Sequence, residues 1–206
     1  MKDWESFLRK HAKSIVNPDH LSSFAQGINF NGEGRAYLSD GILAVRLSGL
    51  PEIGFSYVED LNGKPMDVEA KLPERLNRLF DQEMEGAVTV STKELQQAAD
   101  LHTSLRKAVQ GAKAAKEALY RVDLQRVDGA LRLSHKTEEI SGYTVLAERP
   151  WEDWPVQHVA GDRLLAAAKL FAEDYETVNL EYRNRMMIRL SAGNLEAVLL
   201  GIRVYD

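Results

Sequence analysis

The sequence contains no cysteine. Disulfide bonds, thiolate metal ligands and a cysteine nucleophile are therefore excluded, and a chain without cysteine suits the reducing cytoplasm. The five histidines are scattered, and no two of them stand four residues apart as a helical zinc pair would require. We therefore expect neither a bound metal nor a cofactor.

Long apolar runs and nucleotide-binding motifs are missing as well. No stretch approaches the roughly 18 apolar residues that span a bilayer, and residues 1–14 lack the apolar core of a secretory signal. The sequence has no GxxxxGKS/T phosphate-binding loop and no Gly-x-Ser-x-Gly elbow. These absences favour a cytoplasmic protein that is not an enzyme.

Acidic residues outnumber basic ones, and the net charge of −5 at pH 7 would by itself disfavour a nucleic-acid partner. The basic residues, however, are unevenly distributed. Residues 6–17 and 103–116 together contain seven of the 26 lysines and arginines and none of the 31 acidic residues. Such stretches could bind a polyanion locally, whereas chance unevenness along short helices is the alternative explanation.

Apolar residues at helical spacing predict four helices. They cover residues 4–16, 72–82, 93–116 and a compact segment that begins at 161–162 and includes Phe171. Thr92 and Asp162 are the expected N-caps of the last two helices, because short polar side chains cap free backbone N–H groups.

Alternating apolar and polar residues predict the strands. Two strands within 37–49 are joined by the turn dipeptide Asp40-Gly41. Further strands are expected at 87–91, 120–124, 130–135, 140–147, 177–183, 186–191 and 195–204. Residues 87–206 then follow the order β-α-β-β-β and α-β-β-β, so that each half resembles the other. Trp151 and Trp154, in the intervening loop, are expected to seal a sheet, with base stacking as the alternative.

This doubled order resembles the domain plan of DNA sliding clamps, and short motifs add to the resemblance. LSDGILAV (38–45) is similar to the strand-turn-strand signature of bacterial clamps, with Ser39 in place of a threonine and one residue fewer before Leu43-Ala44. The loop PWEDWPV resembles a connector between clamp half-domains. Residues 162–204 are similar to the last helix and strands of a clamp domain, although Gly201 replaces a proline of the closing motif.

The resemblance implies an α+β fold of the DNA-clamp type. Helices would pack on one face of curved antiparallel sheets, in two pseudo-repeated units. Residues 87–206 would form a complete clamp-like domain and residues 1–86 a partial one.

In clamps, helices line a hole through which duplex DNA passes. The resemblance therefore implies a non-catalytic replication and processivity accessory that binds or encircles duplex DNA without reading its sequence. Lysine and arginine suit this role, because contacts to phosphate carry no sequence information. The expected DNA contacts are Arg9, Lys10, Lys13, Arg75, Arg78, Arg106, Lys107, Lys113, Lys116, Arg163 and Lys169.

Clamps also present a groove in which polymerases and other replication proteins dock a short peptide. By resemblance, Leu200, Ile202, Arg203 and Val204 would contribute to such a groove, whereas in the alternative interpretation they complete a buried strand. A ring of six domains would close as a homotrimer of two-domain chains. The sequence does not decide whether a ring closes.

Two other functions stay open at this stage. One is a protein-interaction module that keeps the clamp scaffold without binding DNA. The other is a metal-dependent nuclease with magnesium held by Asp40, Asp60 and Glu69. A turn role explains Asp40 more simply.

Overall fold

The computed structural model describes residues 3–68, 74–114, 120–136, 140–148 and 153–202 of the 206-residue chain. Internal contacts divide the chain into two compact units. The first contains Met1–Gln82 and Gly193–Val198, and the second contains Glu83–Ala192 and Leu199–Asp206. The short segment Gly193–Val198 therefore packs with residues that lie far from it in the sequence.

The first unit is a sheet with one helix on each face. Its strands follow the order β4-β1-β2-β3-β12. The elements are α1 (Trp4–Ile15), the short 3-10 helix η1 (Ser23–Ala25), β1 (Ile28–Phe30), β2 (Arg35–Ser39), β3 (Leu43–Ser48), β4 (Tyr57–Glu59), α2 (Glu74–Phe80) and most of β12 (Leu195–Leu200). The predicted hairpin is confirmed: Asp40 Oδ1 accepts hydrogen bonds from the N–H groups of Ile42 and Leu43, and Gly41 has a φ of 90°.

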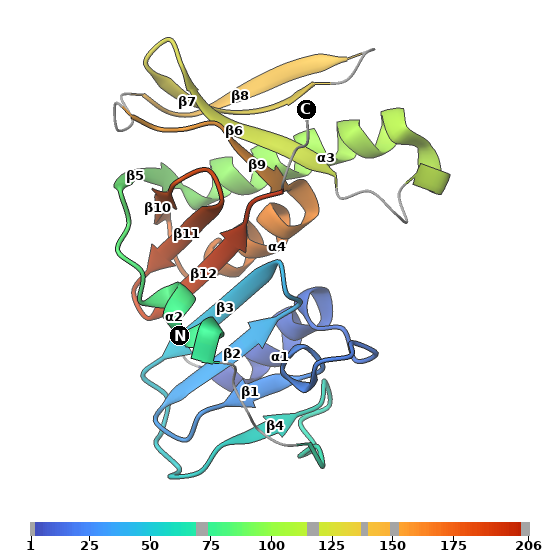
Figure 1. Ribbon diagram of the computed structural model, residues 1–206, viewed down its shortest axis with the longest axis vertical. Coiled ribbons are helices and arrows are strands. Elements are labelled where there is room, and N and C mark those ends of the chain that lie inside the picture. Colours follow the sequence, from blue (N-terminus) through green and yellow to red (C-terminus); the bar gives the residue numbers. More distant parts are fainter. Residues whose placement is uncertain (1–2, 69–73, 115–119, 137–139, 149–152, 203–206) are drawn as a thin grey trace. The chain divides into compact units, whose positions relative to one another are not determined.

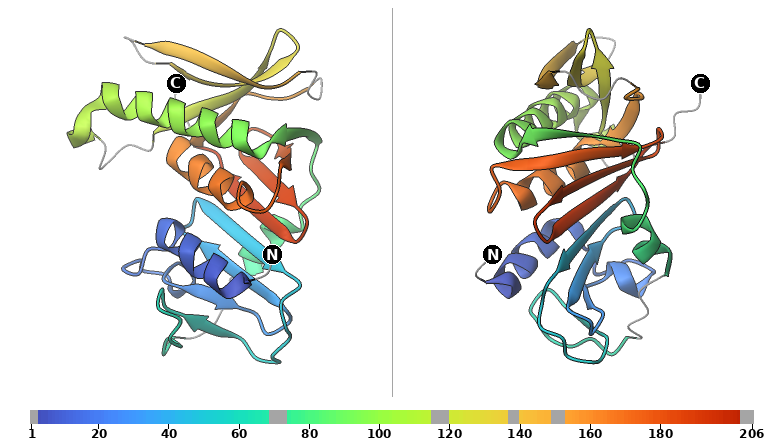
Figure 2. Two further views of the ribbon diagram at one scale, coloured as in Figure 1. Left: turned by 180° about the vertical axis from the view of Figure 1, so that it is seen from behind. Right: turned by 90° about the vertical axis from the view of Figure 1, so that its left-hand side faces the viewer.

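The two helices of this unit lie on opposite faces of its sheet (Figures 1 and 2). Tyr37 of β2 and Arg46 of β3 are partners in register, and both contact Phe80 of α2. Phe30 of β1 contacts Trp4 of α1 instead. Because neighbouring residues of a strand face opposite sides, Ala36, the register partner of Phe30, faces α1 while Tyr37 faces α2.

The second unit confirms the pseudo-repeat. Its first half is β5 (Gly86–Ser91), α3 (Thr92–Ala114), β6 (Arg121–Val127), β7 (Ala130–Lys136) and β8 (Ser141–Glu148). The second half is β9 (Gln157–Ala160), α4 (Gly161–Phe171), β10 (Thr177–Arg183) and β11 (Met187–Ala192), followed by β12. The sequence did not predict β9, which completes the βαβββ order of the second half.

The two halves of this unit exchange their first strands. β9 pairs with β6 in the sheet β8-β7-β6-β9, and β5 pairs with β10, which in turn pairs with β11. α3 and α4 lie side by side (Figures 1 and 2), and α3 contacts β5, β6, β7 and β8 while α4 contacts β9. Trp154 is buried against Tyr182, with ring centroids 4.7 Å apart, which confirms its sealing role; Trp151 lies outside the described residues.

Both predicted N-caps were wrong: the cap of α3 lies one position before Thr92, at Ser91, and that of α4 two positions before Asp162, at Ala160. Ser91 Oγ accepts the hydrogen bond from the Glu94 N–H, while the Thr92 hydroxyl donates to the carbonyls of Tyr175 and Glu176. α4 begins at Gly161, so Asp162 lies within its first turn and caps nothing. A Cβ on Gly161 would come within 2.5 Å of Thr103 Oγ1, so this glycine allows α4 to begin close against α3.

Candidate nucleic-acid interface

α1 presents a polar face that carries exposed lysines. Asp3 caps the helix, because its Oδ1 accepts a hydrogen bond from the Ser6 N–H at 3.0 Å. The residues that α1 buries include Phe7 and Leu8, and the opposite face exposes Lys10 and Lys13. These two lysines help to line an open hollow together with Asp3, Glu5, Ser6, Arg9, Leu61 and Asn62.

Arg9 lies on the same helix, but its guanidinium group forms contacts with other residues of the first unit. Its Nη2 lies 3.5 Å from Glu5 and 3.6 Å from Glu59. Its guanidinium group also fills the space in which a Cβ on Gly63 would stand, at 2.6 Å. Arg9 therefore connects α1 to the turn after β4, which leaves Lys10 and Lys13 as the more accessible bases of this helix.

The second unit contributes bases from α3 and α4. Lys107 is exposed, with its ammonium nitrogen 5.2 Å from the centre of the Tyr120 ring, and Lys169 of α4 is exposed as well. Arg163 is half-buried and lies 3.8 Å from Asp162. Arg106 and Lys113 belong to α3, but their side chains, like all of Lys116, lie outside the described residues.

Charge along the exposed side of α3 is not uniformly positive. Near its start the helix exposes Lys93 and Glu94, and Asp100 follows two turns later. The part of α3 that suits a polyanion is therefore its second half, where Lys107 lies.

α2 does not add to the basic face of α1. Arg78 is exposed on α2, on the opposite side of the first unit's sheet from Lys10 and Lys13. Arg75 also belongs to α2, but its side chain lies outside the described residues. The exposed bases expected in the first unit therefore lie on two faces of its sheet.

The C-terminal segment runs beside β9 and β11 of the second unit. Gly201 N–H donates to the Met186 carbonyl and Ile202 N–H to the His158 carbonyl, each at 2.7 Å. A proline at position 201 could not make the contact to Met186, because proline has no N–H to donate. Leu200 and Ile202 are half-buried, and Arg203 and Val204 lie outside the described residues.

Two of the three acidic residues of the nuclease hypothesis, Asp40 and Asp60, accept hydrogen bonds within turns. Asp60 Oδ1 accepts from the N–H groups of Asn62 and Lys64, and the hydrogen bond from Lys64 contributes most to lowering the pKa of Asp60. Asp40 makes the hairpin contacts given above, and Glu69 lies outside the described residues. Within the described part of the chain, no three His, Asp or Glu side chains are grouped closely enough to hold a metal ion. Nor does any helix there have the length and apolar character of a membrane span.

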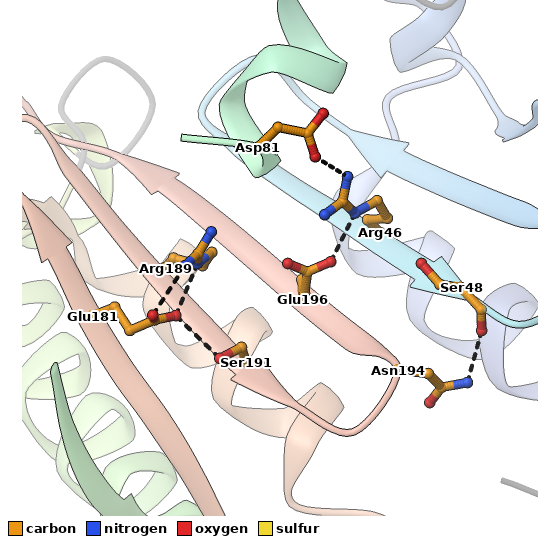
Figure 3. A network of polar contacts seen from close by, with 8 residues as sticks. All are labelled: Arg46, Ser48, Asp81, Glu181, Arg189, Ser191, Asn194 and Glu196. Atoms are coloured by element: carbon orange, nitrogen blue, oxygen red, sulfur yellow. Dashed lines mark hydrogen bonds and ion pairs between the residues drawn. The ribbon is translucent and has the colours of Figure 1, made fainter. Parts of the chain in front are cut away.

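The described residues contain polar clusters that were not predicted from the sequence, among them the following three. In the first unit, Arg46 is buried between Asp81 and Glu196, and in the second Glu181 accepts hydrogen bonds from Arg189 and Ser191 (Figure 3). The third joins His102 to His135. Of these clusters, only the one around Arg46 could have been noticed in the sequence, because Arg46 is a single charged residue within the apolar strand LAVRL (43–47).

Similarity to known proteins is confined to structure. No protein-family model matches the sequence, and no curated protein matches it. The sliding clamp of Pseudomonas aeruginosa superposes with a TM-score of 0.74 at 13% identity, over 96% of this chain and 63% of that one. A putative DNA polymerase III beta subunit from Eubacterium rectale gives 0.75 at 14% identity, over 96% of this chain and 62% of that one.

A third solved structure is the Helicobacter pylori beta clamp bound to a DNA ligase peptide, with a TM-score of 0.72 at 10% identity, over 98% of this chain and 64% of that one. The chain thus spans less than two-thirds of the length of these clamps. At such low identity the likeness concerns the fold, and the clamp fold expected from the doubled order and short motifs is confirmed.

Proposed function

We propose that this chain is a non-catalytic, clamp-like replication accessory that binds duplex DNA without reading its sequence. The observation that supports this most is the exposure of Lys10 and Lys13 on α1, and of Lys107 and Lys169 on α3 and α4, in a chain with the clamp fold. Long cationic side chains on helices that bury their apolar faces can exchange between phosphates. Such contacts position DNA and leave its bases unread.

Binding to a labelled duplex of mixed sequence, measured at several salt concentrations, tests the proposal. The slope of log K against log salt is negative, and each lost phosphate contact reduces its magnitude by about 0.9. The variants Lys10→Gln/Lys13→Gln and Lys107→Gln/Lys169→Gln should each reduce that magnitude by about 2 and weaken binding roughly 50-fold at about 0.1 M salt. Both variants should stay folded with an unfolding temperature near that of the parent, because all four side chains are exposed and only Lys107 has a ring contact, to Tyr120, to lose.

Lys64→Gln is the matched control, since Lys64 is exposed in a turn and belongs to no helix. It should leave the slope unchanged. A parent chain that ignores DNA even at low salt would contradict the proposal and favour the second candidate, a clamp-like scaffold that binds only proteins. Equal losses in Lys64→Gln and the helix variants would also contradict it.

We further propose that β8 is the edge at which another copy of the chain adds. β8 is the outermost strand of its sheet, and Tyr143 and Val145 on this strand are 60% and 44% exposed. Outer strands invite pairing, and ring closure removes such edges. Light scattering should give a multiple of the chain mass, three in a closed ring, and Tyr143→Lys/Val145→Lys should give a monomer. A parent that is monomeric with and without DNA would refute this assembly.

The last described residues are a proposed contact for replication proteins. Leu200 and Ile202 are half-buried on a segment fixed by two backbone hydrogen bonds. The Helicobacter pylori clamp is bound to a DNA ligase peptide. We extend this class of partner, a short peptide of a DNA enzyme, to the present chain.

A further inference from the structure

Four aromatic side chains of the first unit lie in contact with one another at its surface. Phe30 and Tyr57 are stacked with centroids 4.6 Å apart, and Trp4 meets the Phe30 ring edge-on at 5.9 Å. Phe55 lies 5.7 Å from Tyr57. Together with Leu50, Pro51 and Ile53, the first three rings line a recess at the surface.

One wall of this recess is rigid backbone. Gly32 and Gly34 both have a φ near 80°, the left-handed conformation that glycine adopts without strain. Gly32 O accepts hydrogen bonds from the N–H groups of Ile53 and Gly54, and Gly34 O accepts one from Leu50. A Cβ on Gly32 would lie 2.7 Å from the Phe55 backbone, so the two loops touch directly.

The loop that pairs with Gly32 and Gly34 carries two large apolar side chains that are exposed to solvent. Phe55 is 64% exposed and Ile53 is 42% exposed. A scattered apolar side chain needs no explanation, but adjacent exposed ones beside an aromatic recess mark an interaction surface. Aromatic anchors of this kind contribute most of the energy in protein interfaces.

The charges around the recess are mainly negative. Glu33 and Glu52 lie between lining residues and are exposed, and Glu5 is exposed beside Trp4. Burial, together with the charges of Glu59 and Glu5, raises the pKa of Tyr57 to about 12, although the charge of Arg9, which pairs with both carboxylates, acts to lower it. Arg35 is the one base among the lining residues. An occupant with positive charge therefore fits this surface better than a nucleic acid does.

We propose that this aromatic recess docks a cationic, proline-containing segment of a partner protein. Aromatic-lined grooves recognise proline in its extended polyproline conformation. An arginine or lysine of the same segment would lie over the Phe55 ring and face Glu52, which combines a cation–π contact with charge attraction. This site is independent of DNA binding, since it uses neither Lys10 nor Lys13.

Fluorescence anisotropy with a labelled decapeptide of alternating proline and arginine tests the proposal on the full chain. Phe55→Ser and Glu52→Lys should each weaken binding at least 10-fold. Both residues are exposed, so thermal unfolding of these variants should match that of the parent. Lys10→Gln/Lys13→Gln should leave peptide binding intact, which separates this site from the DNA interface.

Two further peptides test whether binding depends on proline as well as on positive charge. A glycine-arginine decapeptide should bind at least 10-fold more weakly than the proline-arginine one, and a proline-glutamate decapeptide should not bind. Equal binding of the two arginine peptides, binding that survives Phe55→Ser, or no binding at all would overturn the proposal. Self-association that is lost in Phe55→Ser would also overturn it, because the occupant would then be a second copy of the chain.

Discussion

Replacing Arg46 by methionine should lower the free energy of unfolding of the first unit by about 3 kcal/mol, the lower end of the range for breaking a buried ion pair. Arg46 is 8% exposed, and its Nε and Nη1 donate to Glu196 at 2.7 Å and to Asp81 at 2.9 Å. Burial acts to lower the pKa of Arg46, but the hydrogen bonds to Glu196 and Asp81 outweigh it and raise this pKa. Methionine keeps an apolar stem near Phe80 yet leaves Glu196 without its counter-charge.

Urea unfolding of matched variants measures this effect. Arg132→Met is the comparison: Arg132 is also largely covered, with its guanidinium carbon 4.3 Å from the centre of the Tyr143 ring, but its partner Asp128 has a side chain that is 78% exposed. Loss of this ion pair should cost less than about 1 kcal/mol, because Asp128 stays in contact with water when its counter-charge is removed. Adding Glu196→Leu to Arg46→Met should recover part of the loss, since an uncompensated carboxylate no longer remains. Equal losses in Arg46→Met and Arg132→Met would show that the buried pair does not stabilise the unit.

The second unit should lose stability on acidification at a higher pH than protonation of its carboxylates would explain. His102 Nδ1 lies 2.7 Å from His135 Nδ1, and His102 Nε2 lies 2.9 Å from Thr144 Oγ1. Both imidazoles are at most 2% exposed. A hydrogen bond between two such nitrogens needs one proton, with one ring as donor and the other as acceptor, so it is lost when both Nδ1 atoms carry a proton.

Burial, followed by the charge of His135, lowers the pKa of His102 to about 4 from its ordinary 6.5. The unfolded chain therefore takes up this proton near pH 6.5, while the folded unit resists it until about pH 4. The free energy of unfolding that neutral His102 contributes is fully present above about pH 6.5, the pKa in the unfolded chain. It is lost as the pH falls from there to about 4, the pKa in the folded unit. The total loss should be about 3 kcal/mol, since each pKa unit corresponds to about 1.4 kcal/mol.

Unfolding free energies measured from about pH 7.5 to about pH 4.5 test this linkage. His102→Gln should be less stable than the parent at neutral pH but should show a smaller decrease on acidification. His20→Gln is the control, because His20 lies in the loop after α1, outside the second unit. An identical pH dependence in the parent and in His102→Gln would assign the acid sensitivity to other groups.

Local patterns in the sequence predicted most elements correctly. The helix at residues 4–16, the Asp40-Gly41 hairpin and the doubled order of residues 87–206 all depend on spacing or turn chemistry within a few residues. β9 was missed because its four residues follow a loop rich in proline and tryptophan, and its register with β6 involves residues more than thirty positions away. The N-caps were predicted wrongly because a shift of one or two residues changes which side chain reaches a free backbone N–H.

The candidate site could be predicted only as a set of bases. Sequence spacing identified the helices that carry Lys10, Lys13, Lys107 and Lys169. It could not show that Arg9 is engaged by Glu59, or that α2 packs on the face opposite α1. It also did not reveal the recess of Trp4, Phe30 and Tyr57, which joins residues from three elements.

The sequence alone determined most helices and strands, with β1, β4 and β9 missed, and the resemblance of two halves to each other, because backbone preference and apolar periodicity act over a few residues. The tertiary structure decided which bases are accessible, which charges are buried and which aromatic rings meet. These depend on contacts between distant segments, such as Arg46 with Glu196 and His102 with His135. Such contacts form only when packing brings their strands and helices together, so no local pattern records them.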